Sequence, residues 1–184
     1  MNRFSLIVPM LLIVALSGCK LFGNEDGDTK TAQDIALAKV QPSKAATTQP
    51  TNQNVEGTVK FVAMGEGVHV TAEISGLSPG KHGFHIHQSG DLSAPDLSSA
   101  GGHYNPASGK HGDAHGDMRH AGDLGNLTAD SNGKATYDQH IAGLKLSDII
   151  GKSIIVHAKE DDVKTDPSGN SGGRVAGGLI EKVE

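Results

Sequence analysis

The sequence is poor in aromatic side chains and in cysteine: Trp is absent, aromatic residues make up 3% of the chain, and Cys19 is its single cysteine. The missing Trp argues against an immunoglobulin-type sandwich, in which a buried Trp packs beside a disulfide. One cysteine also leaves the chain without an intramolecular disulfide. Basic patches with interleaved aromatics are lacking and the formal net charge is −5, so nucleic acid is not an expected partner.

The apolar run at the N-terminus is too short to cross a bilayer. Arg3 precedes an apolar stretch from Leu6 to Leu16, whereas a transmembrane helix needs about 20 apolar residues. This arrangement is typical of an export signal, and the segment Leu16–Cys19 resembles a bacterial lipobox. We therefore expect residues 1–18 to be a lipoprotein signal peptide and Cys19 to carry lipid. A transmembrane anchor or a stray buried cysteine is the alternative.

A lipidated Cys19 would attach the protein to a membrane of the cell envelope, facing the periplasm. The polar residues 19–34 are expected to form a flexible tether. Residues 35–184 are long enough for one folded domain with its own core. Within that domain residues 35–41 are predicted to form a first strand, and residues 42–54 are either a long loop or more of the tether.

Period-two alternation dominates the domain from Val55 onward. Apolar residues alternate with polar ones over 55–63 and again over 68–75, with a Gly-Glu-Gly turn between, which predicts an antiparallel hairpin with one wet face. Asn132-Gly133 lies between two further strand-like segments, 124–129 and 134–140, and predicts a second hairpin. Strands are also expected over 153–159 and 174–183. No segment has a long helical stripe, so we predict an all-β fold of about eight strands in a sandwich or barrel.

Two histidines stand one residue apart on a predicted strand. Side chains at i and i+2 of a strand share a face, so His85 and His87 should project together while Ile86 points the other way. Paired imidazoles suit copper, zinc or nickel. A loop of about 30 residues, from Ser89 to Arg119, follows this strand, and a loop of that length without structure of its own is usually functional or disordered.

Further ligand-type residues occur in short motifs after that strand. The stretches H-G-F-H-I-H, G-H-Y-N-P, R-H-A-G-D-L-G-N and S-G-G-R-V-A-G-G follow one another in this order. In this ordered set the chain resembles the copper/zinc superoxide dismutases of the bacterial exported kind, from about Ile35 to its end. The resemblance implies an eight-stranded antiparallel Greek-key β-barrel with long metal-binding and electrostatic loops.

The resemblance also implies two metal cofactors and a ligand set for each. His103 is expected to bridge the two metals as an imidazolate, because an imidazole ring has two nitrogen donors on opposite sides. Four imidazoles suit copper, and three imidazoles with a carboxylate suit tetrahedral zinc. The implied copper ligands are His85, His87, His103 and His157, and the implied zinc ligands are His103, His111, His120 and Asp123.

Two further residues take roles by the same resemblance. Asp161 is expected to link His85 to His111 by hydrogen bonds, which fix ring orientation. Arg174 is expected at the copper mouth, where its permanent positive charge attracts and orients superoxide, the implied substrate. The implied reaction converts superoxide to dioxygen and hydrogen peroxide, with His103 carrying one of the protons, and would protect the cell envelope from superoxide.

Members of this family usually carry a disulfide between the long metal loop and the last strand. This chain has a cysteine at neither of the two positions that form the disulfide. The corresponding positions are Leu97 and Gly177, so the loop must be held by packing and by the metals. An alternative function is therefore a non-catalytic envelope lipoprotein that buffers or delivers copper and zinc. A homodimer is compatible with the resemblance, but members of the family pair through different surfaces and the sequence does not identify the contacts.

Overall fold

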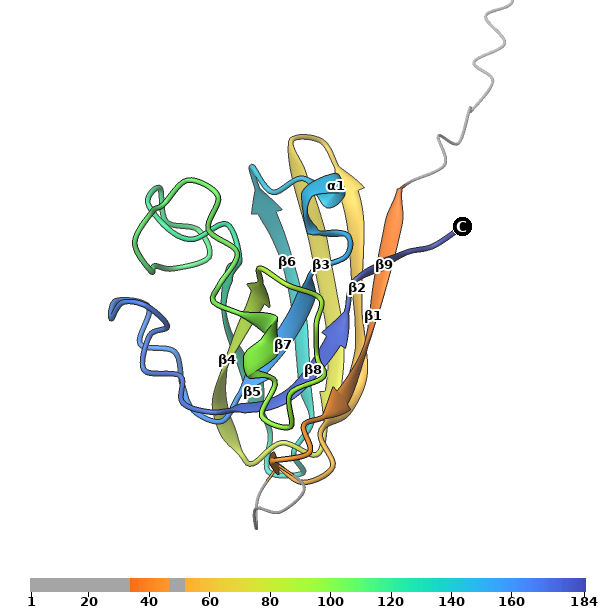
Figure 1. Cartoon of the computed structure of the whole chain (residues 1–184), viewed down its shortest axis with the longest axis vertical. Coiled ribbons are helices and arrows are strands. Elements are labelled where there is room, and N and C mark those ends of the chain that lie inside the picture. The colour runs from red at the N-terminus through yellow and green to blue at the C-terminus, as the bar shows by residue number, and fades with distance from the viewer. Residues whose placement is uncertain (1–33, 47–51) are drawn as a thin grey trace, which may run out of the picture. The chain divides into compact units, whose positions relative to one another are not determined.

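The computed structural model of the chain describes residues 34–46 and 52–184, which form an all-β fold (Figure 1). Eight strands are hydrogen bonded in the order β5-β4-β7-β8-β1-β2-β3-β6, with every neighbouring pair antiparallel, and a short strand β9 pairs with β1. The predicted all-β barrel of eight antiparallel strands is confirmed. The strands are β1 (Ile35–Pro42), β2 (Glu56–Met64), β3 (Gly67–Ser75), β4 (Gly80–His87), β5 (Asp123–Ala129), β6 (Ala135–Ala142), β7 (Ser153–His157), β8 (Arg174–Leu179) and β9 (Glu181–Lys182).

Strands β2 and β3 form the hairpin that the alternation predicts. Their register runs from Glu56 opposite Ser75 to Met64 opposite Gly67, and the inward side chains such as Phe61 and Val70 are fully buried. Most outward positions, such as Lys60 and Glu73, are polar and exposed or half-buried, whereas Val62 and Met64 at the end of β2 are apolar. The predicted strand 174–183 is interrupted at Ile180, which separates β8 from β9, and the predicted strand 153–159 ends at His157.

The predicted pairing of the segments around Asn132-Gly133 is wrong. The turn itself forms, because the Asp130 carboxylate accepts the backbone N–H groups of Asn132 and Lys134. Beyond the turn, however, β5 pairs with β4 and β6 pairs with β3, so the two strands become the two edges of the sheet. The Tyr137 hydroxyl of β6 donates a hydrogen bond to the Leu124 carbonyl of β5 (2.8 Å), which joins these edges and nearly closes the barrel.

The barrel encloses one main apolar core, with a small second cluster outside it. Phe84 and Tyr137 meet edge to face in the main core, with ring centroids 5.2 Å apart. Each large side chain buried in this way contributes roughly 1.5–3 kcal/mol relative to an exposed position. The second cluster lies under the long loop and consists of Leu92, Leu97, Ala100 and Ile155.

The connections carry little helix. The long loop after β4 contains one 3-10 turn, η2 (Ser98–Ala100), and the loop after β6 contains a single α-helical turn, α1 (Leu146–Ile149). Among the described residues, no helix combines the length and apolar content needed to cross a bilayer. The first predicted strand, 35–41, is β1, which ends at Pro42 and pairs with β2, so both strands flanking the segment 43–55 belong to the sheet. The predicted signal peptide over 1–18, the lipidation site Cys19 and the tether up to residue 33 lie outside the described residues.

Candidate metal centre

Strands β4 and β7 carry the first part of a cluster of buried histidines. Ile86 points into the main core, whereas His85 and His87 lie on the other face of β4 as predicted. The ladder between β7 and β8 shifts register between Val156 and His157, so that His157 lies opposite Arg174 at the end of β8. Bulges of this kind re-aim side chains next to functional sites.

The long loop returns to β4 to place His103 beside the strand histidines. His103 forms an isolated bridge with His87, and the Tyr104 N–H donates to the Ile86 carbonyl (2.8 Å). Gly122 passes close to the same carbonyl, where a Cβ would lie 2.2 Å from the Ile86 oxygen, so this approach requires glycine. The later part of the loop is thereby held against β4 as well.

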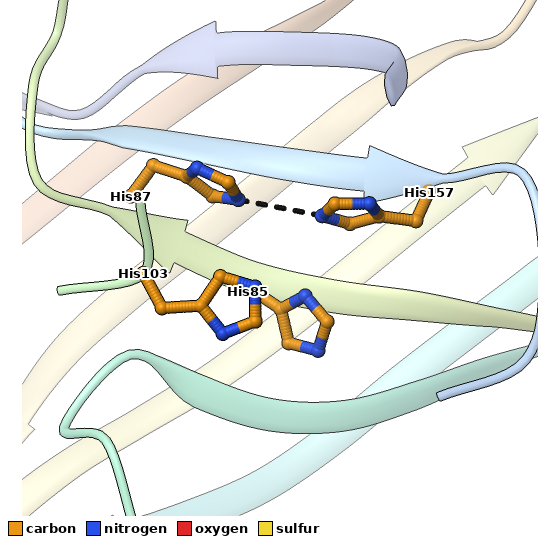
Figure 2. A group of neighbouring side chains, drawn as sticks. All are labelled: His85, His87, His103 and His157. Carbon is orange, nitrogen blue, oxygen red and sulfur yellow. Dashed lines mark hydrogen bonds between the residues drawn. The ribbon is translucent and has the colours of Figure 1, made fainter. Parts of the chain in front are cut away.

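Four histidines converge on one point, and we call them the four-histidine cluster (Figure 2). The His85 and His103 ring centroids lie 4.0 Å apart, and the Nε2 atoms of His87 and His157 lie 3.3 Å apart. The ligand-type nitrogens of the cluster all lie within 4.8 Å of one another. This geometry suits a metal ion that prefers imidazole ligands. The members are His85, His87, His103 and His157.

Hydrogen bonds on the far side of these rings determine which nitrogen faces the centre. His87 Nδ1 lies 2.9 Å from the Gly101 carbonyl and His157 Nδ1 lies 3.2 Å from the Gly172 carbonyl, so both rings present Nε2. His85 instead uses Nε2 to contact Asp161, and so presents Nδ1. Burial lowers the pKa of His85 to about 4 and lowers the pKa values of His87 and His157 as well. These rings are therefore neutral at neutral pH, as metal ligands must be.

A second group shares His103, and we call it the zinc-type cluster: His103, His111, His120 and Asp123. The Asp123 Oδ1 atom lies 2.8 Å from His103 Nδ1, 3.1 Å from His111 Nδ1 and 3.3 Å from His120 Nδ1. The other carboxylate oxygen accepts the backbone N–H groups of Gly112 and His120. Burial opposes ionisation of Asp123, but its contacts with His103 and His111 hold its pKa well below the usual range. Three imidazoles and a carboxylate form a common donor set for zinc.

Buried nitrogens without hydrogen-bond partners mark both clusters. In the described part of the chain, four buried side-chain atoms make no hydrogen bond, and three of them are His85 Nδ1, His103 Nε2 and His111 Nδ1, the last of which lies near Asp123 Oδ1 without forming a hydrogen bond to it. The fourth is Ser171 Oγ. An unpaired buried polar atom costs about 1–3 kcal/mol, and a metal ion at each cluster would satisfy all three nitrogens. The donor sets therefore fit two metal ions that share the His103 ring.

Asp161 joins the two clusters from behind. Its Oδ2 lies 2.7 Å from His85 Nε2 and its Oδ1 lies 2.7 Å from His111 Nε2. Although burial opposes ionisation, the two histidines hold the pKa of Asp161 well below its usual range. Burial lowers the pKa of His111, but its contacts with Asp123 and Asp161 prevail and raise it to about 10. The link between His85 and His111 lies where the sequence predicts it.

Two residues that support Asp161 were not identified from the sequence. Asn126 bonds the Asp161 backbone twice: its Oδ1 accepts the N–H (2.8 Å) and its Nδ2 donates to the carbonyl (2.9 Å). Gly169 has φ +59° and approaches so closely that a Cβ would lie 1.8 Å from Asp161 Oδ1. Asn126 ends the motif R-H-A-G-D-L-G-N and could have been singled out there, whereas nothing in the sequence distinguishes Gly169 from other loop glycines.

A cleft leads from the surface to the four-histidine cluster, and Arg174 lines it. Pro167 and Ser168, from the loop after β7, lie on the same cleft. Arg174 is half-buried, and burial lowers its pKa while the nearby Asp96 opposes that change. Guanidinium retains its proton in proteins, so the cleft has a permanent positive charge beside the histidines.

The chain was also compared with known proteins. Residues 55–180 match the family model described as copper/zinc superoxide dismutase. The chain is 42% identical over 164 residues to a protein of Brugia pahangi named extracellular superoxide dismutase [Cu-Zn], an alignment that covers 83% of this chain and 77% of the relative. It is 46% identical over 140 residues to a superoxide dismutase [Cu-Zn] of Onchocerca volvulus, covering 68% of this chain and 88% of the relative.

Proposed function

Because the chain belongs to the copper/zinc superoxide dismutase family, we propose that the four-histidine cluster is its copper site and the zinc-type cluster its zinc site. The protein is a superoxide dismutase with copper and zinc as cofactors. The assignment of ligands rests mainly on His103. Its Nδ1 contacts Asp123 of the zinc-type cluster, and its Nε2, on the other side of the ring, is buried without a hydrogen-bond partner. An imidazole in that position can ligate both metals at once.

Bound copper supplies the one-electron redox chemistry by which two superoxide ions and two protons become dioxygen and hydrogen peroxide, while zinc, which is d¹⁰, has no redox step. His103 would take up a proton at Nε2, the nitrogen that is not bonded to Asp123, and give it to the product. Asp161 holds the Nε2 sides of the His85 and His111 rings and so directs the Nδ1 atom of each ring toward its metal cluster. Arg174 attracts and orients the anion from its place on the cleft.

A non-catalytic protein for metal buffering needs neither a shared histidine nor a cation on the cleft. His103 and Arg174 both occupy such positions, which favours the catalytic function over the alternative. The test is superoxide consumption by the full chain loaded with copper and zinc, followed by removal of zinc and a second measurement. We expect equimolar binding of the two metals and consumption that depends on copper. Stoichiometric binding of both metals without such consumption would contradict the proposal.

The ligand assignment has its own test. Substitution His103→Ala should weaken both copper and zinc binding, because this ring belongs to both clusters. The matched variant His120→Ala should weaken zinc binding alone. Metal competition titrations followed by elemental analysis would separate the two outcomes. Loss of one metal only from the His103 variant would show that the ring does not bridge.

We further propose that the mature protein is attached through lipid on Cys19 to a membrane of the cell envelope, faces the periplasm and protects the envelope from superoxide. The short apolar run and the lipobox-like Leu16–Cys19 support this proposal. The relative from Brugia pahangi is named an extracellular superoxide dismutase, which agrees with export. The substitution Cys19→Ser should move the protein from the membrane fraction of cells to a soluble fraction. Retention in the membrane would contradict lipid attachment at this residue.

A further inference from the structure

The guanidinium of Arg174 is held by the long loop and not by its own strand. Its Nη1 donates a hydrogen bond to the carbonyl of Leu97, and its Nη2 donates to the carbonyl of Gly101 (2.5 Å). Gly101 also accepts from His87 through its carbonyl, so the same short segment contacts a histidine of the four-histidine cluster. The direction in which Arg174 points therefore depends on where residues 97–101 lie.

Leu97 has an unusual backbone for a leucine. Its φ is 60° and its ψ is 19°, a left-handed conformation that residues with a Cβ seldom adopt. In this conformation its carbonyl accepts a hydrogen bond from Arg174 while the residue is 6% exposed. Leu97 is therefore fixed at both ends, by a hydrogen bond at its backbone and by packing at its side chain.

The side chain of Leu97 packs in the small cluster outside the main core, which we call the loop anchor: Leu92, Leu97, Ala100 and Ile155. Gly177 of β8 makes room for it. A Cβ at position 177 would lie 3.1 Å from Leu97 Cδ1 and 2.8 Å from Ile155 Cδ1. Because the φ of Gly177 is not positive, space and not backbone conformation explains why glycine suits this position.

Backbone hydrogen bonds tie other parts of the loop. The Ser89 N–H donates to the Ala100 carbonyl (3.0 Å), and the Ala45 N–H donates to the Pro95 carbonyl (2.9 Å). The backbone bonds of Leu97 itself, to Ala94 and Ala100, stay within the loop, so the loop anchor is what attaches Leu97 to β7 through Ile155. The chain has one cysteine, which lies outside residues 35–184, so no covalent bond can do this within the domain.

We propose that Leu97 is a positioning residue for Arg174. Its side chain, seated over Gly177 in the loop anchor, holds the carbonyls of residues 97 and 101 against the guanidinium. Apolar packing thereby holds this part of the loop against β8, as a disulfide between positions 97 and 177 would. The proposal rests on the function of Arg174 as the anion guide, and its test must separate the two.

The test is a double-mutant cycle on the enzyme loaded with copper and zinc. Arg174→Ala should lower the rate constant for superoxide consumption by at least about tenfold and flatten its dependence on ionic strength. Leu97→Ala should lower the rate several-fold in the native background and have no effect in the Arg174→Ala background. Leu97→Met, which keeps a large unbranched side chain, should restore most of the rate. Leu77→Ala, a buried leucine of the main core, is the matched control and should leave the rate unchanged once metals are bound.

A second readout does not depend on the loaded enzyme. In the metal-free protein, amide hydrogen exchange over residues 94–101 should be faster in Leu97→Ala than in the native chain, and native-like in Leu97→Met. If Leu97→Ala does not fold, Gly177→Ala tests the same packing, because the added methyl group would crowd Ile155 at 2.8 Å and Leu97 at 3.1 Å and so shift the loop anchor.

The outcomes are distinct. An unchanged rate for Arg174→Ala would overturn the guide function of Arg174. A reduced rate for Arg174→Ala with an unchanged rate for Leu97→Ala would overturn only the positioning proposal. So would an equal loss from Leu97→Ala in both backgrounds, because Leu97 would then act on stability or metal binding and not through Arg174.

Discussion

At the scale of single residues, the histidines His85, His87 and His157 each present one nitrogen to the four-histidine cluster, because the other nitrogen contacts a carboxylate or a backbone carbonyl. His85 presents Nδ1 because Asp161 occupies its Nε2, and His87 presents Nε2 because the Gly101 carbonyl occupies its Nδ1. A histidine with an unoccupied second nitrogen could rotate or change tautomer. The partners behind the rings therefore matter for metal binding as much as the rings do.

Asp161→Asn tests this at the residue scale. An amide has one acceptor oxygen, so either His85 or His111 loses its partner, and zinc affinity should fall by about 10- to 100-fold. Competition with a zinc chelator measures the change. Asp138→Asn is the control, since Asp138 is exposed and contacts only His69 among the described salt bridges. Equal zinc affinities for the native chain and Asp161→Asn would show that the link is dispensable.

Gly169→Ala should resemble Asp161→Asn. The added Cβ would lie 1.8 Å from Asp161 Oδ1 at a φ of +59°, so the carboxylate or the loop must move. Zinc affinity should fall, as measured by the same chelator competition. Gly173→Ala is the matched control, because no atom lies within 4 Å of the Cβ there, and it should bind zinc as the native chain does.

The ligand-type residues of the centre could be assembled from the sequence because their motifs follow a family order. The contacts that orient them could not. Asn126 supports Asp161 from β5, 35 positions away, and Gly169 approaches it from later in the same loop after β7, so neither contact can be inferred from residue spacing. The hydrogen bond from Arg174 to the Leu97 carbonyl cannot be predicted from the sequence either, because it joins residues 77 positions apart and its acceptor is a backbone atom.

At the scale of elements, the turn between β5 and β6 forms as its residues predict, but the two strands do not pair with each other. Alternation predicts the β2–β3 hairpin correctly because strands that share an apolar face and a short turn pair with each other. The turn at Asn132-Gly133 is equally well formed, yet β5 and β6 each find another partner. Turn residues specify the reversal of the chain, while the Greek-key order of the barrel decides which strands become edges.

Tyr137→Phe tests how much the contact between the two edge strands contributes. The substitution leaves the buried Leu124 carbonyl without its partner, so the free energy of unfolding should fall by about 1–3 kcal/mol. Urea denaturation of the metal-free protein measures this. Tyr104→Phe is the control, because the Tyr104 ring is half-buried and packs beneath the Lys152 ammonium, a contact that a phenyl ring retains. A change below about 0.5 kcal/mol for Tyr137→Phe would show that the hydroxyl does not help to close the barrel.

At the scale of the whole molecule, the barrel is held without a covalent cross-link. The single cysteine lies outside the described residues, and the long loop is secured by the loop anchor, by backbone hydrogen bonds and by ligands of the metal centre. Removal of a disulfide typically costs about 2–5 kcal/mol, so this packing offsets a substantial loss. The fold consequently contains no bond that a thiol reductant can break.

Insensitivity to reductants is the expected outcome for the whole enzyme. Superoxide consumption and the thermal midpoint of the metal-free protein should be the same with and without excess dithiothreitol, measured in a buffer from which free metals are excluded. Cys19→Ser serves as the control for any effect of the thiol itself. A lower midpoint in dithiothreitol for the native chain, but not for Cys19→Ser, would reveal a cross-link between chains.

Strand β1 also determines how the enzyme is presented to its surroundings. The chain enters the domain at Ile35, while just past the other end of β1 the Ser43 hydroxyl donates to the Arg174 carbonyl (3.0 Å). The seven steps along the strand separate these ends by roughly 23 Å. Anything that holds residue 34 is therefore kept a strand length from the arginine that lines the cleft, so the opening can stay accessible to diffusing anions even when the N-terminal side of the domain rests against a surface.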